Sequence, residues 1–225
     1  MSPPRTVQAI RSLERPDSLS ERIYADLRAR LQAGQVAPDE RLIDIDVAEA
    51  CGTSRMPARE ALLRLVSEGY LVRTTRGFAV PTLSATDVRH LFEVRRMLEP
   101  QAAASAVADL GDKGMAALGA ALARARRAAA TGSAEEMIAA NMDFRAAWLA
   151  RVANPRLVDA ISRFIDHAQI VRLKTLNDPR SQRAALAGLA GLHDAFAARD
   201  RDQVRRRMEA FLLAAERAFE ATQAR

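Results

Sequence analysis

The sequence predicts a mostly α-helical protein in two parts: an N-terminal unit of three short helices with a small β-hairpin, then an all-α bundle of about six helices. Three observations predict this fold class. Apolar residues recur at helical spacing through most of the chain, a short alternating segment occupies 70–80, and 81–225 is an almost unbroken series of alanine-, leucine- and arginine-rich stretches. The 225 residues, 49% of them hydrophobic, suffice for two modest domains.

Turn residues divide the N-terminal unit into its elements. We expect three helices, over about 19–33, 44–51 and 55–68. Gly34 ends the first, a tight Gly-Thr-Ser turn separates the second from the third, and Gly69 ends the third. The following YLVRTTRGFAV alternates well enough for two strands joined by a turn at 74–77. This order of elements is that of a winged helix-turn-helix domain.

Short loops divide the C-terminal region. We expect six helices, over about 85–109, 112–130, 134–152, 155–176, 181–198 and 200–223. Ser84, with Asp87 three residues later, is typical of a capping box at the start of the first helix. Because the loops are short, successive helices should pack as antiparallel neighbours. The expected domains are a flexible segment 1–17, a winged helix-turn-helix 18–80, a linker 81–86 and a helical domain 87–225.

The helix over 55–68 carries two arginines beside its apolar stripe. Arg55 and Arg59 lie one turn apart and project from the N-terminal turn, with Met56 beside them. Pro57 is tolerated in this first turn, and Ser54 stands in position to cap it. Two convergent arginines at a helix N-terminus attract phosphate, and such a helix fits the DNA major groove, where arginine pairs with guanine. The alternative is an ordinary solvated arginine face.

Charge and composition limit the class of function. The formal net charge of +6 permits nucleic-acid binding, and the stretch 53–80 holds five arginines against two glutamates. The sequence has no run of about 18 apolar residues and no secretory signal, so we expect a cytoplasmic protein without a membrane partner. It also lacks the common hydrolase, metalloprotease and phosphate-loop motifs, which argues against an enzyme. The single cysteine, Cys51, is expected to be buried.

The segment PDERLIDIDVAEACGTSRMPAREALLRLVSEGYLVRTTRGFAV (38–80) resembles the winged-helix domain of GntR-type bacterial transcription regulators. The resemblance implies a set of DNA-binding residues: Ser54, Arg55, Met56, Pro57, Arg59, Arg76 and Gly77. In this family Arg55 and Arg59 would contact bases or phosphates, and the wing tip would enter the minor groove. Met56 stands where threonine is common, and Asp44 stands where glutamate is usual. Family members bind palindromic sites as two-fold dimers, so we expect a homodimer on double-stranded operator DNA.

The segment HLFEVRRMLEPQAA (90–103) resembles the first helix of the FCD effector domain of FadR-like members, and six helices suit its shorter, VanR-like variant. In many FCD domains an aspartate and three histidines hold a divalent metal that captures a carboxylate ligand. Aligned on that pattern, the four positions here are Asn141, Arg145, Leu189 and Phe211. An amide, a cation and two hydrocarbons cannot hold a divalent ion, so we expect no metal and no cofactor.

Arg95 and Arg145 interrupt the apolar stripes of their helices, and a buried guanidinium requires a partner. Internal candidates are Glu93, Glu99 and Asp143. The alternative is a carboxylate or phosphate effector that Arg145 and Arg95 bind directly, beside Asn141. His193, on the apolar side of its helix, is either a packed core residue or a further pocket group.

The expected function is a transcription regulator, specifically a repressor, controlled by a small organic acid in the helical domain. The alternative is a constitutive DNA-binding regulator whose pocket is filled by Leu189 and Phe211.

Overall fold

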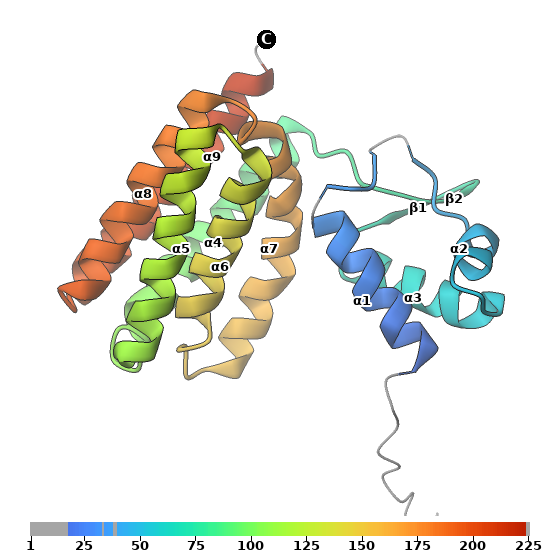
Figure 1. Ribbon diagram of the computed structural model, residues 1–225, viewed down its shortest axis with the longest axis horizontal. Helices are drawn as coiled ribbons and strands as arrows, with labels where there is room; N and C mark the ends of the chain where they lie inside the picture. The colour runs from blue at the N-terminus through green and yellow to red at the C-terminus, as the bar shows by residue number, and fades with distance from the viewer. Residues whose placement is uncertain (1–17, 33, 38–39, 224–225) are drawn as a thin grey trace, which may run out of the picture.

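The N-terminal unit of the computed structural model consists of helices α1 (Leu19–Gln32), α2 (Asp44–Ala50) and α3 (Arg55–Ser67) and strands β1 (Val72–Thr74) and β2 (Gly77–Ala79) (Figure 1). The structure describes residues 18–32, 34–37 and 40–223. The segment 1–17, which we expected to be flexible, lies outside the described residues. The predicted order of three helices and a hairpin is confirmed.

The apolar stripe of α3 forms the centre of this unit's core. Its buried side chains are Ala58, Ala61, Leu62 and Leu65, as the spacing predicts. They pack with buried apolar residues of α1 and α2, and α1 and α2 both lie against α3. The hairpin is antiparallel, and Leu42 and Phe78 exchange two backbone hydrogen bonds of 2.8 and 2.9 Å. These bonds fasten the wing to the segment that leads into α2.

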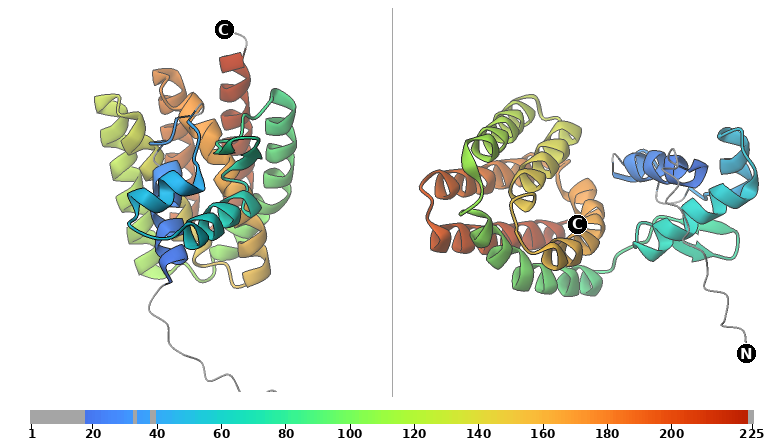
Figure 2. Two further views of the ribbon diagram at one scale, coloured as in Figure 1. Left: turned by 90° about the vertical axis from the view of Figure 1, so that its right-hand side faces the viewer. Right: turned by 90° about the horizontal axis from the view of Figure 1, so that it is seen from below.

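The C-terminal unit is a helical bundle, as predicted. Its helices are α4 (Ala85–Ala106), α5 (Gly111–Thr131), α6 (Ala134–Leu149), α7 (Pro155–Thr175), α8 (Pro179–Ala197) and α9 (Arg201–Gln223). The predicted capping box is present, because the Asp87 amide donates to the Ser84 hydroxyl and the Asp87 carboxylate accepts from the Ser84 amide. Helix α4 packs along α9, and α5 packs along both α6 and α8. Figure 2 shows the bundle and the N-terminal unit as two lobes joined by an extended segment.

Several predicted boundaries were wrong by a few residues. Helices α4 and α6 each end three residues earlier than expected, because the apolar pattern continues through the turns that follow them. Helix α4 begins at Ala85, so the first turn of this helix takes the last two residues of the expected linker 81–86. Cys51 follows the last residue of α2 and is exposed, which contradicts the prediction of a buried thiol.

Helix α7 lies on the side of the bundle that faces the N-terminal unit (Figure 1). Gly34 has a φ of 71°, and a Cβ atom added there would stand 2.5 Å from Leu173 Cδ2. Glycine therefore permits both the left-handed backbone and a close approach between the end of α1 and α7.

In the part of the chain that the structure describes, no helix combines the length and apolarity needed to cross a membrane.

Candidate functional site

The N-terminal turn of α3 presents two arginines that share one carboxylate. Arg55 Nη2 donates to both oxygens of Asp44, at 3.0 and 3.2 Å, and Arg59 Nη1 donates to Asp44 Oδ2 at 3.2 Å. The Asp44 side chain is 8% exposed, whereas those of Arg55 and Arg59 are 59% and 47% exposed. The predicted convergence of the two arginines is thus confirmed, and the group that holds them together is Asp44.

Asp44 stays ionised at neutral pH. Burial alone would raise the pKa of its carboxyl group, but the hydrogen bonds and positive charges of Arg59 and Arg55 outweigh burial and lower that pKa below its ordinary value. The sequence marked Asp44 only as a departure from the usual glutamate. The sequence could have identified Asp44 as the partner of the two arginines from its position, because the first residue of α2 lies beside the first turns of α3.

A hollow of about 500 Å³ separates this turn from the wing. Its charged lining residues are Asp44, Arg55, Arg59, Arg73 and Arg76. Four guanidinium groups and one carboxylate therefore face this hollow within the described residues. A surface with this balance of charge and with several planar donors suits the phosphates and guanine edges of DNA.

Gly77 contributes to the wing through its backbone. Its φ is 112°, and an added Cβ would stand 2.5 Å from the Leu42 carbonyl oxygen. Thr74 Oγ1 also donates to the Gly77 carbonyl at 3.1 Å, which closes the turn that presents Arg76. The structure thus explains why glycine is required at 77, and its expected DNA contact stays a prediction.

Ser54 does not cap α3 with its side chain, which corrects one prediction. An N-cap hydroxyl usually accepts from the N–H of the second or third helical residue, and here the third residue is Pro57, which has no N–H. Ser54 and Met56 are exposed, Met56 to 65%, so the first turn of α3 faces solvent. The N-terminal amides of the helix are therefore available to an anion outside the protein.

A second polar site lies inside the bundle, where Arg95 and Arg145 share Glu99. Arg95 Nε donates to Glu99 Oε1 at 2.6 Å, and Arg145 Nη2 lies 3.3 Å from Glu99 Oε2. Of the three predicted internal partners, Glu99 is the one that pairs with both arginines. Burial would raise the pKa of Glu99, which is 1% exposed, but the charges of Arg145 and Arg95 outweigh burial and lower it.

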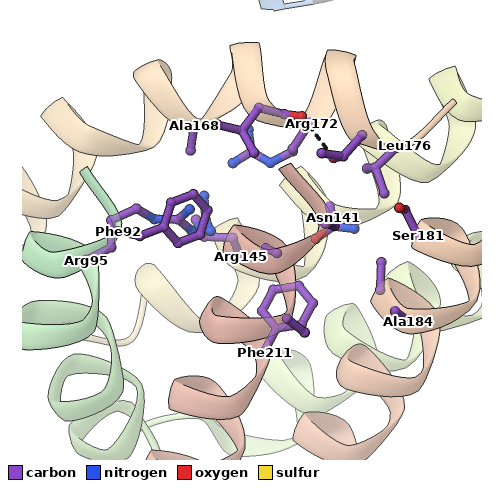
Figure 3. A pocket seen from close by; sticks show the side chains of 16 residues that line it. Phe92, Arg95, Asn141, Arg145, Ala168, Arg172, Leu176, Ser181, Ala184 and Phe211 are labelled. Carbon is purple, nitrogen blue, oxygen red and sulfur yellow. Dashed lines mark hydrogen bonds between the residues drawn. The ribbon is translucent and has the colours of Figure 1, made fainter. Parts of the chain in front are cut away.

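These arginines line a small pocket between α4, α6, α7, α8 and α9, the arginine pocket (Figure 3). Its volume is about 50 Å³, and its other lining residues include Asn141, Arg172 and Phe211. The described lining holds three guanidinium groups and no carboxylate, since Glu99 lies outside it. The sequence did not single out Arg172, because it sits on a helix whose other residues gave no reason to expect a pocket there.

The structure brings three of the four aligned metal positions together. Asn141, Arg145 and Phe211 reach the arginine pocket, while Leu189 is buried in the core. These side chains supply one amide and a permanent cation, which do not suit a divalent metal. In the described segments, no group of three His, Cys, Asp or Glu side chains is placed to hold a metal ion.

His193 does not line this pocket, so of its two expected roles the structure favours that of a packed residue. It is partly buried on α8, with Nδ1 3.5 Å from Asp194 Oδ1. Its Nε2 lies 3.7 Å from the position that a Cβ atom of Gly119 would take. The side chain therefore packs between α8 and α5.

Both units match known families. Residues 19–80 match the bacterial regulatory proteins of the gntR family, and residues 90–214 match the FCD domain. The chain is 36% identical over 145 residues to the HTH-type transcriptional regulator McbR of Escherichia coli (strain K12), over 64% of this chain and 66% of McbR. It is 38% identical over 82 residues to the Nta operon transcriptional regulator of Aminobacter aminovorans, over 36% of this chain and 39% of that protein. Each alignment spans less than two thirds of the relative's length.

Solved structures agree with these matches. The structure of E. coli McbR/YncC is similar with a TM-score of 0.80 at 28% identity, and the match covers 92% of this chain and 99% of that one. A putative transcriptional regulator GntR from Rhodococcus sp. RHA1 shares the fold, with a TM-score of 0.75 at 21% identity over 90% of this chain and 97% of that one. The chain belongs to the GntR family of transcriptional regulators, in its FadR-type branch with a C-terminal FCD domain.

Proposed function

We propose that this regulator is a repressor that binds a palindromic double-stranded operator as a homodimer. The observation that carries the proposal is the pairing of Arg55 and Arg59 on Asp44, opposite the wing arginines Arg73 and Arg76. A guanidinium has five N–H donors, so each arginine keeps donors for a base edge or phosphate after bonding Asp44. Two copies of the surface would occupy two half-sites.

Asp44 holds the side chains of Arg55 and Arg59 in place on this surface. A free arginine side chain loses about 2 kcal/mol of rotamer entropy when it is fixed, and bonds to a buried carboxylate reduce that loss before DNA arrives. In this proposal, α3 enters the major groove, Arg55 and Arg59 bind guanine or phosphate, and Met56 meets an apolar group such as the thymine methyl. Ser54 and Pro57 lie against the DNA backbone, and the wing tip at Arg76 and Gly77 reaches the adjacent minor groove. Binding to chromosomal DNA would place the protein in the bacterial cytoplasm.

Arg76→Ala tests the wing. We expect weaker operator binding with little change in base preference, because the minor groove distinguishes base pairs poorly and an arginine at its edge also neutralises the flanking phosphates. Each lost phosphate contact should reduce the slope of log affinity against log salt by about 0.9. Fluorescence anisotropy at four salt concentrations measures this slope. Arg217→Ala, an exposed arginine on α9, is the matched control and should keep the parent slope. A parent slope in Arg76→Ala would contradict the wing contact.

We also propose that a small carboxylate is the effector and that it binds in the arginine pocket without a metal. The support is electrostatic, because Arg95, Arg145 and Arg172 bring three positive charges to the described wall, and Asn141 adds an amide. Carboxylates pair strongly with guanidinium groups where water is excluded. The cavity of about 50 Å³ limits the ligand to a very small acid unless Phe211 moves. We propose no catalytic activity for this site.

The second candidate is a constitutive regulator with no effector in this pocket. Two observations favour it: Glu99 already serves as the internal carboxylate, and the cavity falls below the volume of about 300 Å³ at which ligand pockets begin. In this account Phe211 and the arginines simply complete the core. The two candidate functions predict different results: an added small carboxylate stabilises the protein if the arginine pocket binds it, and does not if the regulator is constitutive.

Thermal denaturation with acetate, pyruvate and other small carboxylates separates the two candidates. If the pocket binds an acid, a concentration 100 times Kd stabilises the parent by about 2.7 kcal/mol, and Arg145→Ala loses most of that stabilisation. Arg217→Ala should respond as the parent does. Equal stabilisation of Arg145→Ala and the parent would refute the arginine pocket as the site. No stabilisation by any member of the panel would favour the constitutive regulator.

A further inference from the structure

We propose a second ligand site, between the two units, that binds an apolar molecule carrying one anionic group. The site is a cavity of about 350 Å³ between the N-terminal unit and α7, which we call the interdomain cavity. It goes beyond the effector proposed for the arginine pocket, because it lies on the opposite face of α7 and has different walls. Both the DNA-binding unit and the FCD domain contribute to it.

The size of the interdomain cavity suits an organic ligand. Small-molecule pockets have volumes of about 300–1,000 Å³ and are common at domain interfaces. The interdomain cavity falls within that range, whereas the arginine pocket, at about 50 Å³, does not. An effector that enters without any side-chain movement therefore has more room between the units than inside the bundle.

Its walls are mainly apolar and come from three parts of the chain. The N-terminal unit supplies Leu31, Val36 and Tyr70, the connecting segment supplies Val80, Pro81 and Thr82, and α7 supplies Ile170 and Leu173. Leu31, Val36 and Tyr70 are also buried members of the N-terminal core. An apolar ligand would therefore pack against the core of the DNA-binding unit on one side and against α7 on the other. Burial of apolar surface on both sides would favour its binding.

The polar groups of the cavity favour an anion. Lys174 is the one charged residue in its described lining. Its ammonium lies over the ring of Phe219, 5.7 Å from the ring centroid, and among the described residues no carboxylate lies within ion-pair distance of it. Asn177 lies in the turn that follows α7. One N–H of its amide donates to the Leu173 carbonyl at 2.9 Å, which leaves the other for a ligand. A carboxylate near Lys174 would find an ammonium donor beside an amide, and no lining carboxylate of the described part would repel it.

Helix α7 joins the interdomain cavity to the arginine pocket. Gln169 lines the interdomain cavity and is 4% exposed, and its Oε1 accepts from Arg172 Nη1, an arginine-pocket group, at 2.7 Å. In the same region, Leu173 of α7 packs closely against Gly34 of the N-terminal unit. A ligand here would contact both units at their closest approach, and would therefore favour one placement of the DNA-binding unit over others.

Sodium octanoate is a suitable probe, because it has an apolar chain and one carboxylate. We would titrate it into the full chain by calorimetry, with 1-octanol as the uncharged probe. Thr82 and Ala184 form a matched pair, since both are small, exposed residues that line the interdomain cavity and the arginine pocket respectively. Thr82→Phe should fill the first cavity and Ala184→Phe the second. Lys174→Gln removes the positive charge, and Ile170→Phe fills the first cavity from α7.

We expect the parent and Ala184→Phe to bind octanoate with Kd of about 1 mM or tighter. Thr82→Phe and Ile170→Phe should each bind it at least tenfold more weakly, and Lys174→Gln should weaken octanoate more than 1-octanol. Parent-like binding by both filling variants, loss of binding in Ala184→Phe alone, or no binding by the parent would each overturn the proposal. Operator binding by ligand-free Thr82→Phe, measured separately, should match the parent, so failure of DNA recognition would be distinguished from failure of this site.

Discussion

Replacing Arg59 with alanine is expected to weaken operator binding by about 1–3 kcal/mol in each half-site, which is the discrimination that a bidentate arginine–guanine pair provides. In a dimer the two losses combine. The free energy of unfolding should change little, because the Arg59 side chain is 47% exposed and its removal leaves Asp44 bonded to Arg55. Arg59→Lys should lose most of the same affinity, since an ammonium cannot reproduce the planar fork of arginine.

Fluorescence anisotropy at one fixed salt concentration measures this loss, with Arg217→Ala as the control for removal of one positive charge. Asp44→Asn provides a second test of the same surface. It removes a negative charge, so affinity for random DNA should rise, but it also frees the two arginines, so preference for the operator should fall. If Arg59→Ala bound the operator as tightly as the parent, α3 would not be the element that recognises DNA.

Glu99→Gln is expected to destabilise the FCD domain by about 3–5 kcal/mol, because it leaves Arg95 and Arg145 buried without their shared carboxylate. Chemical denaturation at neutral pH, followed by circular dichroism, measures the change. Glu220→Gln, an exposed residue near the end of α9, is the matched control and should alter the free energy of unfolding by less than about 0.5 kcal/mol. A loss below about 1 kcal/mol in Glu99→Gln would be close to the effect of an ordinary surface substitution. It would contradict a structural role for the group formed by Arg95, Glu99 and Arg145.

The pH dependence of stability follows from the direction of the Glu99 pKa shift. Its pKa is lower in the folded protein than in the unfolded chain, where a glutamate has a pKa of about 4.3. The stabilising contribution is therefore complete above that pH and is lost as pH falls toward the lower, folded-state pKa. The parent should lose stability across that acidic range more steeply than Glu99→Gln. Parallel curves for the two proteins would show that Glu99 does not titrate with a shifted pKa.

Local patterns predicted the elements that depend on neighbouring residues. The apolar stripe of α3, the turn between the two strands and the Ser84 capping box all follow from residues within about one or two helical turns of one another, and all are present. Ser54 is the local prediction that was wrong. Its hydroxyl lacks the usual third N–H of the helix because Pro57 occupies that position.

Contacts across the fold were harder to predict. Arg95 and Arg145 required an acidic partner, but only the packing of α4 against α6 selects Glu99 over Asp143, which bonds Arg124 at 2.9 Å instead. Asp44 lies 11 residues from Arg55 and meets it only after the turn between α2 and α3 has formed. The interdomain cavity has no sequence pattern of its own, because each of its walls is an ordinary apolar segment.

The most direct test of the central claim is the selection of binding sites from a randomised double-stranded library by the purified full chain. The proposal predicts an enriched palindrome with half-sites about one helical turn apart, bound at least about 1,000-fold more tightly than scrambled DNA at physiological salt. A library that yields no common motif, with equal affinity for selected and scrambled DNA, would contradict the assignment of α3 and the wing as a sequence-specific DNA-binding surface.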